Sequence, residues 1–147
     1  MLFGPLSRAL LPALIALPLT AGAAQPVIEV YKTASCGCCK QWVKHLEENG
    51  FTVKAQDVTD PGDYRAKFGI ADQYGSCHTG RVQGYALEGH VPASDIKRML
   101  ATRPAAAGLA VPGMPMGSPG MEAAHSEPYE VLLVKKDGSS TVYKRYR

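Results

Sequence analysis

Three cysteines within four residues give the strongest chemical signal in this sequence. They form the motif Cys36-Gly37-Cys38-Cys39, which follows the strand-like run 27–31 and opens an amphipathic helix. Thiols at a helix start face unpaired backbone N–H groups and the positive end of the helix dipole, which favour the thiolate over the thiol. Because the thiolate is the form that binds soft metals and attacks disulfides, the motif indicates metal or redox chemistry.

The spacing of the cysteines limits the disulfides that they can form. The Cα atoms of neighbouring Cys38 and Cys39 are ~3.8 Å apart, which is below the usual span of a disulfide. If the motif is helical throughout, Cys36 and Cys38 point to nearly opposite faces, whereas Cys36 and Cys39 share one face. A Cys36–Cys39 bridge is therefore expected to form most easily, and it leaves Cys38 and Cys77 either free or paired with each other.

The elements around the motif are expected to run β-α-β-α, then a hairpin, then α. They cover strand 27–32, helix 36–49, strand 51–55, helix 63–68, a hairpin turning at Gly84, and helix 94–101 capped by Ser94. A strand leading into a helix with cysteines at i and i+3 is the thioredoxin-like arrangement. We therefore expect one α/β, thioredoxin-like domain over 25–147, with a central mixed sheet flanked by helices and an added C-terminal β-hairpin around Asp137-Gly138.

The same fold would bring a fourth thiol to the motif. In thioredoxin-like folds the loop before the third strand faces the helix-start cysteines, and thioredoxins keep a cis-proline there. This sequence has no proline at 76–79 and has Cys77-His78 instead. We expect Cys77 to join the other three thiols, with His78 as a less direct candidate ligand; the alternative is a Cys38–Cys77 disulfide.

A stretch rich in Pro, Gly, Ala and Met, residues 103–128, is expected to be a loop without regular structure. It carries three thioethers, Met114, Met116 and Met121, with His125 nearby. Thioethers together with thiolates select Cu(I). Flexible methionines filling apolar gaps under a surface loop are the alternative.

Copper is favoured over zinc by the ligand set. Structural zinc sites usually have two spaced C-x₂-C units, whereas this chain has one tight cluster and one distant cysteine. Adjacent thiolates also suit bridging between several Cu(I) ions. His45, ~10 Å from Cys38 along the helix, is expected to lie outside the site at the surface. For His90 two roles stay open: its hairpin-to-helix loop returns it to the site, or it has a structural role, which is favoured.

The first 24 residues are expected to be a cleaved signal peptide. The apolar run 9–19 is too short to span a bilayer and precedes a small-residue cleavage site near Ala23 or Ala24. Removing Arg8 lowers the formal charge from +3 to +2, because the leader holds no acidic residue. So small an excess does not favour nucleic acid, and no other segment is long enough to cross a membrane; we expect a soluble, exported protein without nucleic-acid or membrane partners.

Five segments of the mature chain, 31–40, 76–79, 88–92, 108–115 and 117–122, resemble one family of exported metal-binding proteins, the CopG-type copper-resistance proteins, long described as a domain of unknown function. The resemblance implies a thioredoxin-like fold, a periplasmic location and a role in copper handling. It implies copper ligation by Cys36, Cys38, Cys39 and Cys77, while His78 and the methionines lie in the shared motifs as further candidate ligands. It also implies redox activity towards copper, and as partners copper ions and periplasmic copper chaperones or efflux components.

Two functions stay open on the sequence. The favoured one is a periplasmic protein that holds Cu(I), as a single ion or a multinuclear cluster, for copper resistance. The alternative is an enzyme, a thiol–disulfide oxidoreductase in which Cys36 attacks and Cys39 resolves. The missing proline before the third strand counts against the alternative.

Overall fold

The computed structural model describes residues 26–147, so the expected signal peptide lies outside the described residues. Eleven elements follow one another: β1 (Val27–Lys32), α1 (Gly37–Glu48), β2 (Thr52–Asp57), α2 (Pro61–Lys67), the 3₁₀ turn η1 (Asp72–Tyr74), β3 (His78–Val82), β4 (Tyr85–Glu88), α3 (Ala93–Thr102), β5 (Gly108–Ala110), β6 (Tyr129–Val134) and β7 (Ser140–Tyr146). No helix within 26–147 has the length and hydrophobicity needed to cross a membrane.

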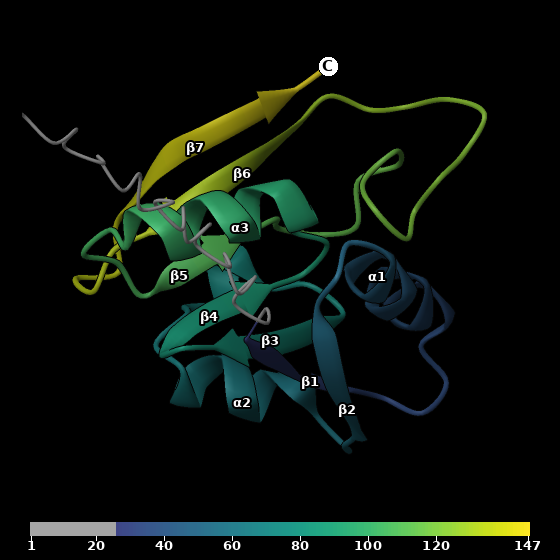
Figure 1. The fold of residues 1–147 in the computed structure, drawn as a ribbon, viewed down its shortest axis with the longest axis horizontal. Coiled ribbons are helices and arrows are strands. Elements are labelled where there is room, and N and C mark those ends of the chain that lie inside the picture. Colours follow the sequence, from purple (N-terminus) through teal and green to yellow (C-terminus); the bar gives the residue numbers. More distant parts are fainter. Residues whose placement is uncertain (1–25) are drawn as a thin grey trace, which may run out of the picture.

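The seven strands within residues 26–147 form one sheet in the order β2-β1-β3-β4-β5-β6-β7 (Figure 1). The pairs β1–β2 and β4–β5 are parallel, and the remaining neighbours are antiparallel. Parallel neighbours need a crossover, and α1 and α3 supply it. The expected mixed sheet with flanking helices and a C-terminal hairpin is confirmed.

The two faces of the sheet carry different layers. Side chains of α1 and α3, including Trp42 and Ile96, pack with Ile28, Leu87 and Leu109 in the larger core. Helix α2 covers the opposite face (Figure 1). There Tyr31 of β1 stacks on Tyr64 at a ring-centroid distance of 3.8 Å. This division follows from the two-residue period of strands, which sends alternate side chains to opposite faces.

Helix α3 starts differently from the expectation. Ser94 was expected to be its N-cap, but the helix begins one residue earlier, and its N-cap position is Pro92, which has no side-chain cap hydrogen bond. The free N–H of Ala93 instead donates to Nε2 of His45 on α1, at 3.1 Å. A cap from another element leaves no pattern in the local sequence, so the sequence could not indicate it.

The expected loop 103–128 contains a strand. Residues Gly108–Ala110 form β5, which pairs with β4 on one side and β6 on the other. Three residues are too few to show a period in the sequence. Gly108 is required there, because a Cβ atom would lie 2.0 Å from the Ala86 carbonyl oxygen.

Candidate metal centre

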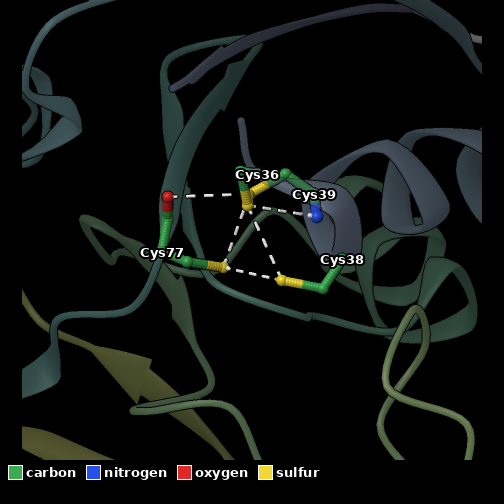
Figure 2. A group of neighbouring side chains, drawn as sticks. All are labelled: Cys36, Cys38, Cys39 and Cys77. Carbon is green, nitrogen blue, oxygen red and sulfur yellow. Dashed lines mark hydrogen bonds between the residues drawn. A yellow bond between two sulfur atoms is a disulfide. The ribbon is translucent and has the colours of Figure 1, made fainter. Parts of the chain in front are cut away.

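The four cysteine sulfurs lie together, as Figure 2 shows. The Sγ atoms of Cys36, Cys38, Cys39 and Cys77 are all within 4.8 Å of one another. The Cys38 and Cys77 sulfurs are 3.7 Å apart, and the Cys39 and Cys77 sulfurs are 3.5 Å apart. The structure thus brings together all four thiols that the sequence singles out.

The backbone at the start of α1 explains why three neighbouring cysteines can converge. Cys36 is the N-cap, with an extended φ of −72° and ψ of 98°, and its sulfur accepts the N–H of Cys39 at 3.3 Å. Since Cys36 is not itself helical, it does not point away from Cys38, and the two sulfurs are 3.6 Å apart. The expectation of opposite faces was wrong because it took the whole motif as helical.

Two of the four cysteines form a disulfide. Cys36 and Cys39 are bonded, with Cα atoms 5.4 Å apart, whereas Cys38 and Cys77 are free. The expected Cys36–Cys39 bridge is therefore present, and of the two fates left open for Cys38 and Cys77 the structure has the unpaired one. Cys39 is fully buried under the helix start.

Cys77 comes from the loop between η1 and β3 and is the only one of the four that does not belong to the start of α1. Burial first, and then the neighbouring Cys38, raise the pKa of its thiol to about 12, because two thiolates side by side repel each other. Without a cation, Cys77 therefore remains a thiol. A metal ion would supply the positive charge that replaces this proton.

Two buried histidines extend the cysteine cluster on the inner side. His78 and His90 are both fully buried, and with Cys77 they form a second group whose ligand atoms lie within 4.8 Å of one another. The Cys77 sulfur is 3.4 Å from Nδ1 of His78 and 3.2 Å from Nε2 of His90. Cys77 is thus common to both groups of candidate ligands.

The hydrogen bonds of His90 define which ring nitrogen carries the proton. Nδ1 lies 2.8 Å from the carbonyl oxygen of Pro119, which can only accept, so Nδ1 is the donor. In the neutral ring Nε2 then presents its lone pair towards Cys77, and burial favours this form by lowering the pKa of His90. An imidazole whose far nitrogen donates to a carbonyl is the arrangement that orients metal-binding histidines.

Sequence reasoning left His90 open and favoured a structural role, whereas the structure places it against Cys77. The only signal was its motif, Glu88-Gly89-His90-Val91-Pro92, because the loop that returns it to the cysteines follows a strand of ordinary pattern. Its approach depends on the backbone of Gly89, which has a φ of +70°.

His78 faces the same interior. Burial, and then the nearby His90, lower its pKa to about 3, so its ring is neutral. Its ring lies 4.3 Å from the Trp42 ring, centroid to centroid, and Trp42 donates from Nε1 to the Val91 carbonyl at 2.8 Å. Nε2 of His78 is buried without a hydrogen-bond partner among the described residues, which is rare for a polar atom in a folded interior.

The methionine-bearing part of the expected loop crosses next to the cysteines. This part, residues 113–121, is called the 113–121 segment below. Gly113 donates its N–H to the Gly75 carbonyl at 3.0 Å and accepts from the Ser76 hydroxyl, directly beside Cys77. At its other end, Gly120 lies against the Cys38 carbonyl at the start of α1.

The methionine side chains differ in exposure. Met114 is 50% exposed and Met116 is 38% exposed, while Met121 is half-buried and His125 is exposed. The thioethers of Met114 and Met116 are therefore open to solvent, although the segment that carries them contacts Ser76 at one end and the start of α1 at the other. Their role as ligands, and that of Met121, stays a prediction.

His45 does not lie free at the surface as expected. Its ring is half-buried, and Nε2 accepts a hydrogen bond from the Ala93 N–H. As expected, His45 is absent from both groups of candidate ligands. Its role in the fold is to cap α3.

The donor set fits a thiophilic ion. Four sulfurs around one tetrahedral ion at metal–sulfur distances of ~2.3 Å would be ~3.7 Å apart, close to the separations of the non-bonded pairs given above. Thiolates and neutral imidazoles are the donors that copper and zinc accept, whereas calcium and magnesium require oxygen ligands. Once the disulfide is reduced, the cluster can close around a metal with little movement.

Two solved structures resemble this chain in sequence and in fold. A solved structure titled "Copper resistance protein copG- Form 2" is 44% identical, with a TM-score of 0.79, over 84% of this chain and 99% of the other. A second, "Copper resistance protein copG- Form 1", is also 44% identical, with a TM-score of 0.78, over 83% and 98%. The chain belongs to the CopG copper-resistance family.

The family resemblance seen in the sequence is therefore confirmed. The family described as "Protein of unknown function, DUF411" matches residues 74–121, which in this CopG-family chain contain Cys77, His78, His90 and the 113–121 segment. No curated protein matches the sequence. The match thus covers the half of the metal centre that lies outside α1.

Proposed function

We propose that this protein is a periplasmic copper-resistance protein that holds Cu(I) through Cys36, Cys38, Cys39 and Cys77. The convergence of four cysteine sulfurs within 4.8 Å carries the proposal. The relatives named for copper resistance support the choice of metal. Soft thiolate donors favour Cu(I) over harder ions, and zinc is the second choice.

The centre holds more than one copper ion in this proposal. Cys77 belongs both to the cysteine group and to the group with His78 and His90. A thiolate has several lone pairs and can bridge two ions, so one ion bound mainly by sulfur and one bound by sulfur and imidazole would share Cys77. Met121 or an exposed methionine of the 113–121 segment would complete a coordination shell.

Binding requires the Cys36–Cys39 disulfide to be opened. A dithiol reductant that opens it supplies two electrons and two protons and is itself oxidised to a disulfide; copper then displaces the protons of the two thiols formed. The reverse reaction, formation of the disulfide, can reduce copper. Two thiolates that form the disulfide release two electrons, which convert two Cu(II) ions to two Cu(I) ions. This balance supports the copper redox role that accompanies binding in the proposal.

An anaerobic competition experiment tests the binding role. Fully reduced protein is titrated with Cu(I) against a colorimetric Cu(I) chelator, and total copper is measured after desalting. We expect retention against the chelator and a loss of about tenfold or more in affinity for Cys77→Ser. A parallel titration with Zn²⁺ should give weaker binding.

Two results would contradict the proposal. Complete transfer of Cu(I) from the parent to a weak chelator would exclude a copper-holding role. Equal affinity of the parent and Cys77→Ser would exclude a site shared by all four cysteines.

The second candidate function is thiol–disulfide exchange by Cys36 and Cys39. The observation that favours it is the disulfide at a helix start, with the Cys36 sulfur accepting the Cys39 N–H. The strand order β2-β1-β3-β4 with helices on both faces also supports a thioredoxin-like arrangement. Metal-free protein should then reduce insulin in the presence of dithiothreitol and lose this activity in Cys36→Ala.

Export to the periplasm, after cleavage near Ala23 or Ala24, is part of the proposal. We also propose that the mature domain begins there and that periplasmic copper chaperones or efflux components exchange copper with it. N-terminal sequencing of protein from the periplasmic fraction should give Ala24 or Gln25. Recovery of the intact N-terminus from the cytoplasmic fraction would contradict the assignment.

A further inference from the structure

A buried carboxylate lies beneath the loop that carries Cys77. Glu88, the last residue of β4, is fully buried on the face of the sheet that α2 covers. Burying a carboxylate is costly unless charge and hydrogen bonds compensate it. Glu88 is compensated by three groups: the Ser76 N–H at 2.7 Å, the Thr79 hydroxyl, and Nη1 of Arg65 at 3.4 Å.

Two of these three partners flank Cys77 in the chain. Ser76 precedes it and donates its backbone N–H to Oε1, whereas Thr79 follows two residues later and donates its hydroxyl to Oε2. The two oxygens of one carboxylate therefore hold the backbone on both sides of the thiol. Glu88 does not appear in either group of candidate metal ligands.

The third partner fixes the carboxylate itself. Arg65 extends from α2, and besides Glu88 it binds Asp72 at the start of η1 through Nη2, at 3.0 Å. The loop leaves space for this side chain at Gly75, where a Cβ atom would be 3.1 Å from the Arg65 guanidinium carbon and 2.9 Å from the Asp72 carbonyl oxygen. Arg65 and Glu88 thus join α2, η1 and β4 under the Cys77 loop.

The opposite side of the loop is confined as well. A Cβ atom at Gly89 would be 2.7 Å from the Ser76 Cβ, so the chain that leaves β4 at Gly89 packs directly against the loop. The Ser76 hydroxyl donates to the Gly113 carbonyl. The loop 75–77, which carries Cys77, therefore contacts the 113–121 segment on one side and the Glu88 carboxylate on the other.

We infer that Glu88 is a positioning residue for the metal centre: through Ser76 and Thr79 it holds the Cys77 sulfur at the distance from the α1 cysteines that a shared ion requires. This inference rests on the proposed function. Three of the cysteines lie at the start of α1, and that helix fixes their positions. The fourth, Cys77, lies in a loop that precedes β3, so no strand pairing fixes the backbone at Ser76. The geometry of the site therefore depends on what fixes this loop.

The first measurement needs no copper. In the oxidised, metal-free protein only Cys38 and Cys77 are free, so alkylation followed by peptide mass analysis gives the ratio of their reaction rates. In Glu88→Ala we expect the Cys77 to Cys38 ratio to rise about fivefold, because the released loop exposes the Cys77 thiol. Glu88→Gln retains an acceptor for the Ser76 N–H and should restore most of the parental ratio.

The second measurement is a double-mutant cycle for Cu(I) affinity in the reduced protein. We expect Glu88→Ala to weaken binding about tenfold in the parent and to have almost no effect in a Cys77→Ser background. The matched control is Glu130→Gln, which removes a carboxylate paired with Arg145 at 2.8 Å in the β6–β7 hairpin, belongs to neither group of candidate ligands and should change neither readout.

The outcomes separate this inference from the proposed function. An unchanged alkylation ratio in folded Glu88→Ala, or an equal loss of affinity with and without Cys77, would overturn the positioning role. If the parent does not retain Cu(I), the proposed function fails, and the alkylation ratio still decides the role of Glu88. If Glu88→Ala does not fold, Thr79→Val, which removes one anchor and keeps the carboxylate, takes its place with the same expected directions.

Discussion

Gly120 packs against the backbone of Trp42 so closely that a Cβ atom at position 120 would lie 2.8 Å from the Trp42 nitrogen. With a φ of +88°, Gly120 also has a backbone conformation that side chains disfavour. This contact joins the 113–121 segment to the helix that presents three of the four cysteines.

Gly120→Ala should therefore destabilise the protein by about 3 kcal/mol, the sum of a left-handed backbone penalty and an overlap with α1. Its matched control is Gly138→Ala, because Gly138 has a φ of +84° but no atom within 4 Å of an added Cβ. The control should lose only about 1 kcal/mol. Urea unfolding of both variants measures the difference, and equal losses would show that the contact with α1 contributes nothing.

The His45–Ala93 hydrogen bond makes stability depend on pH. Burial lowers the pKa of His45 below 6.5, although Glu122 and Glu48 act in the opposite direction, so the folded state binds the proton less well than the unfolded state. The stabilising contribution is present above pH 6.5 and is lost as the pH falls through the folded-state pKa. A protonated Nε2 could no longer accept the Ala93 N–H.

His45→Gln keeps an acceptor and has no charge to gain, so its unfolding free energy should fall less steeply with decreasing pH than that of the parent. His45→Ala should lose about 1 kcal/mol at pH 8, because the first turn of α3 loses its cap. Denaturant unfolding between pH 8 and pH 5 provides both values. Parallel curves for the parent and His45→Gln would contradict the assignment.

Thiol counting should give two different numbers for this chain. Denatured, metal-free protein that has not been reduced should react at Cys38 and Cys77 only, and reduced protein should react at all four cysteines. Peptide mass analysis should place the bridge between Cys36 and Cys39. A bridge between Cys38 and Cys77 would mean that the two pairs exchange and that the oxidised state is not the one described.

His90→Ala should weaken Cu(I) binding by about tenfold or lower the number of ions bound, because it removes the lone pair that faces Cys77. The control is His125→Ala, since His125 is an exposed histidine that belongs to neither ligand group. Copper per protein is measured by elemental analysis after desalting. If both variants bind as the parent does, the imidazole of His90 is not a ligand.

The parts of the fold that the sequence predicted are those with a local cause. Val27–Lys32 is rich in β-branched and aromatic residues and forms a largely buried strand, and Asp137-Gly138 provides the turn of the last hairpin, so both elements were found. The hairpin at Gln83-Gly84 was found for the same reason, because Gly84 marks the turn, and in the structure both residues have the positive φ that such a turn needs. Long-range causes were not visible: β5 exists because β4 and β6 flank it, and α3 is capped from α1.

The metal centre shows the same division. Cys36, Cys38 and Cys39 are adjacent in sequence, and Cys77 could be placed with them because the order of elements brings its loop to the helix start. His90 could not, because its position depends on the left-handed Gly89 and on a carbonyl of the 113–121 segment. The relative orientation of Cys36 and Cys38 was missed because a cap residue does not follow helical geometry.

Strand β5 also bears on how far this protein can be shortened. Leu109 and Val111 lie in the same core as Val131 of the hairpin, and β5 is enclosed by β4 and β6. Ending the chain after α3, to isolate a minimal metal-binding fragment, would leave the β4 edge open and expose apolar surface of the sheet to aggregation. The segment that borders the cysteines and the hairpin that follows it are thus inseparable parts of one folding unit.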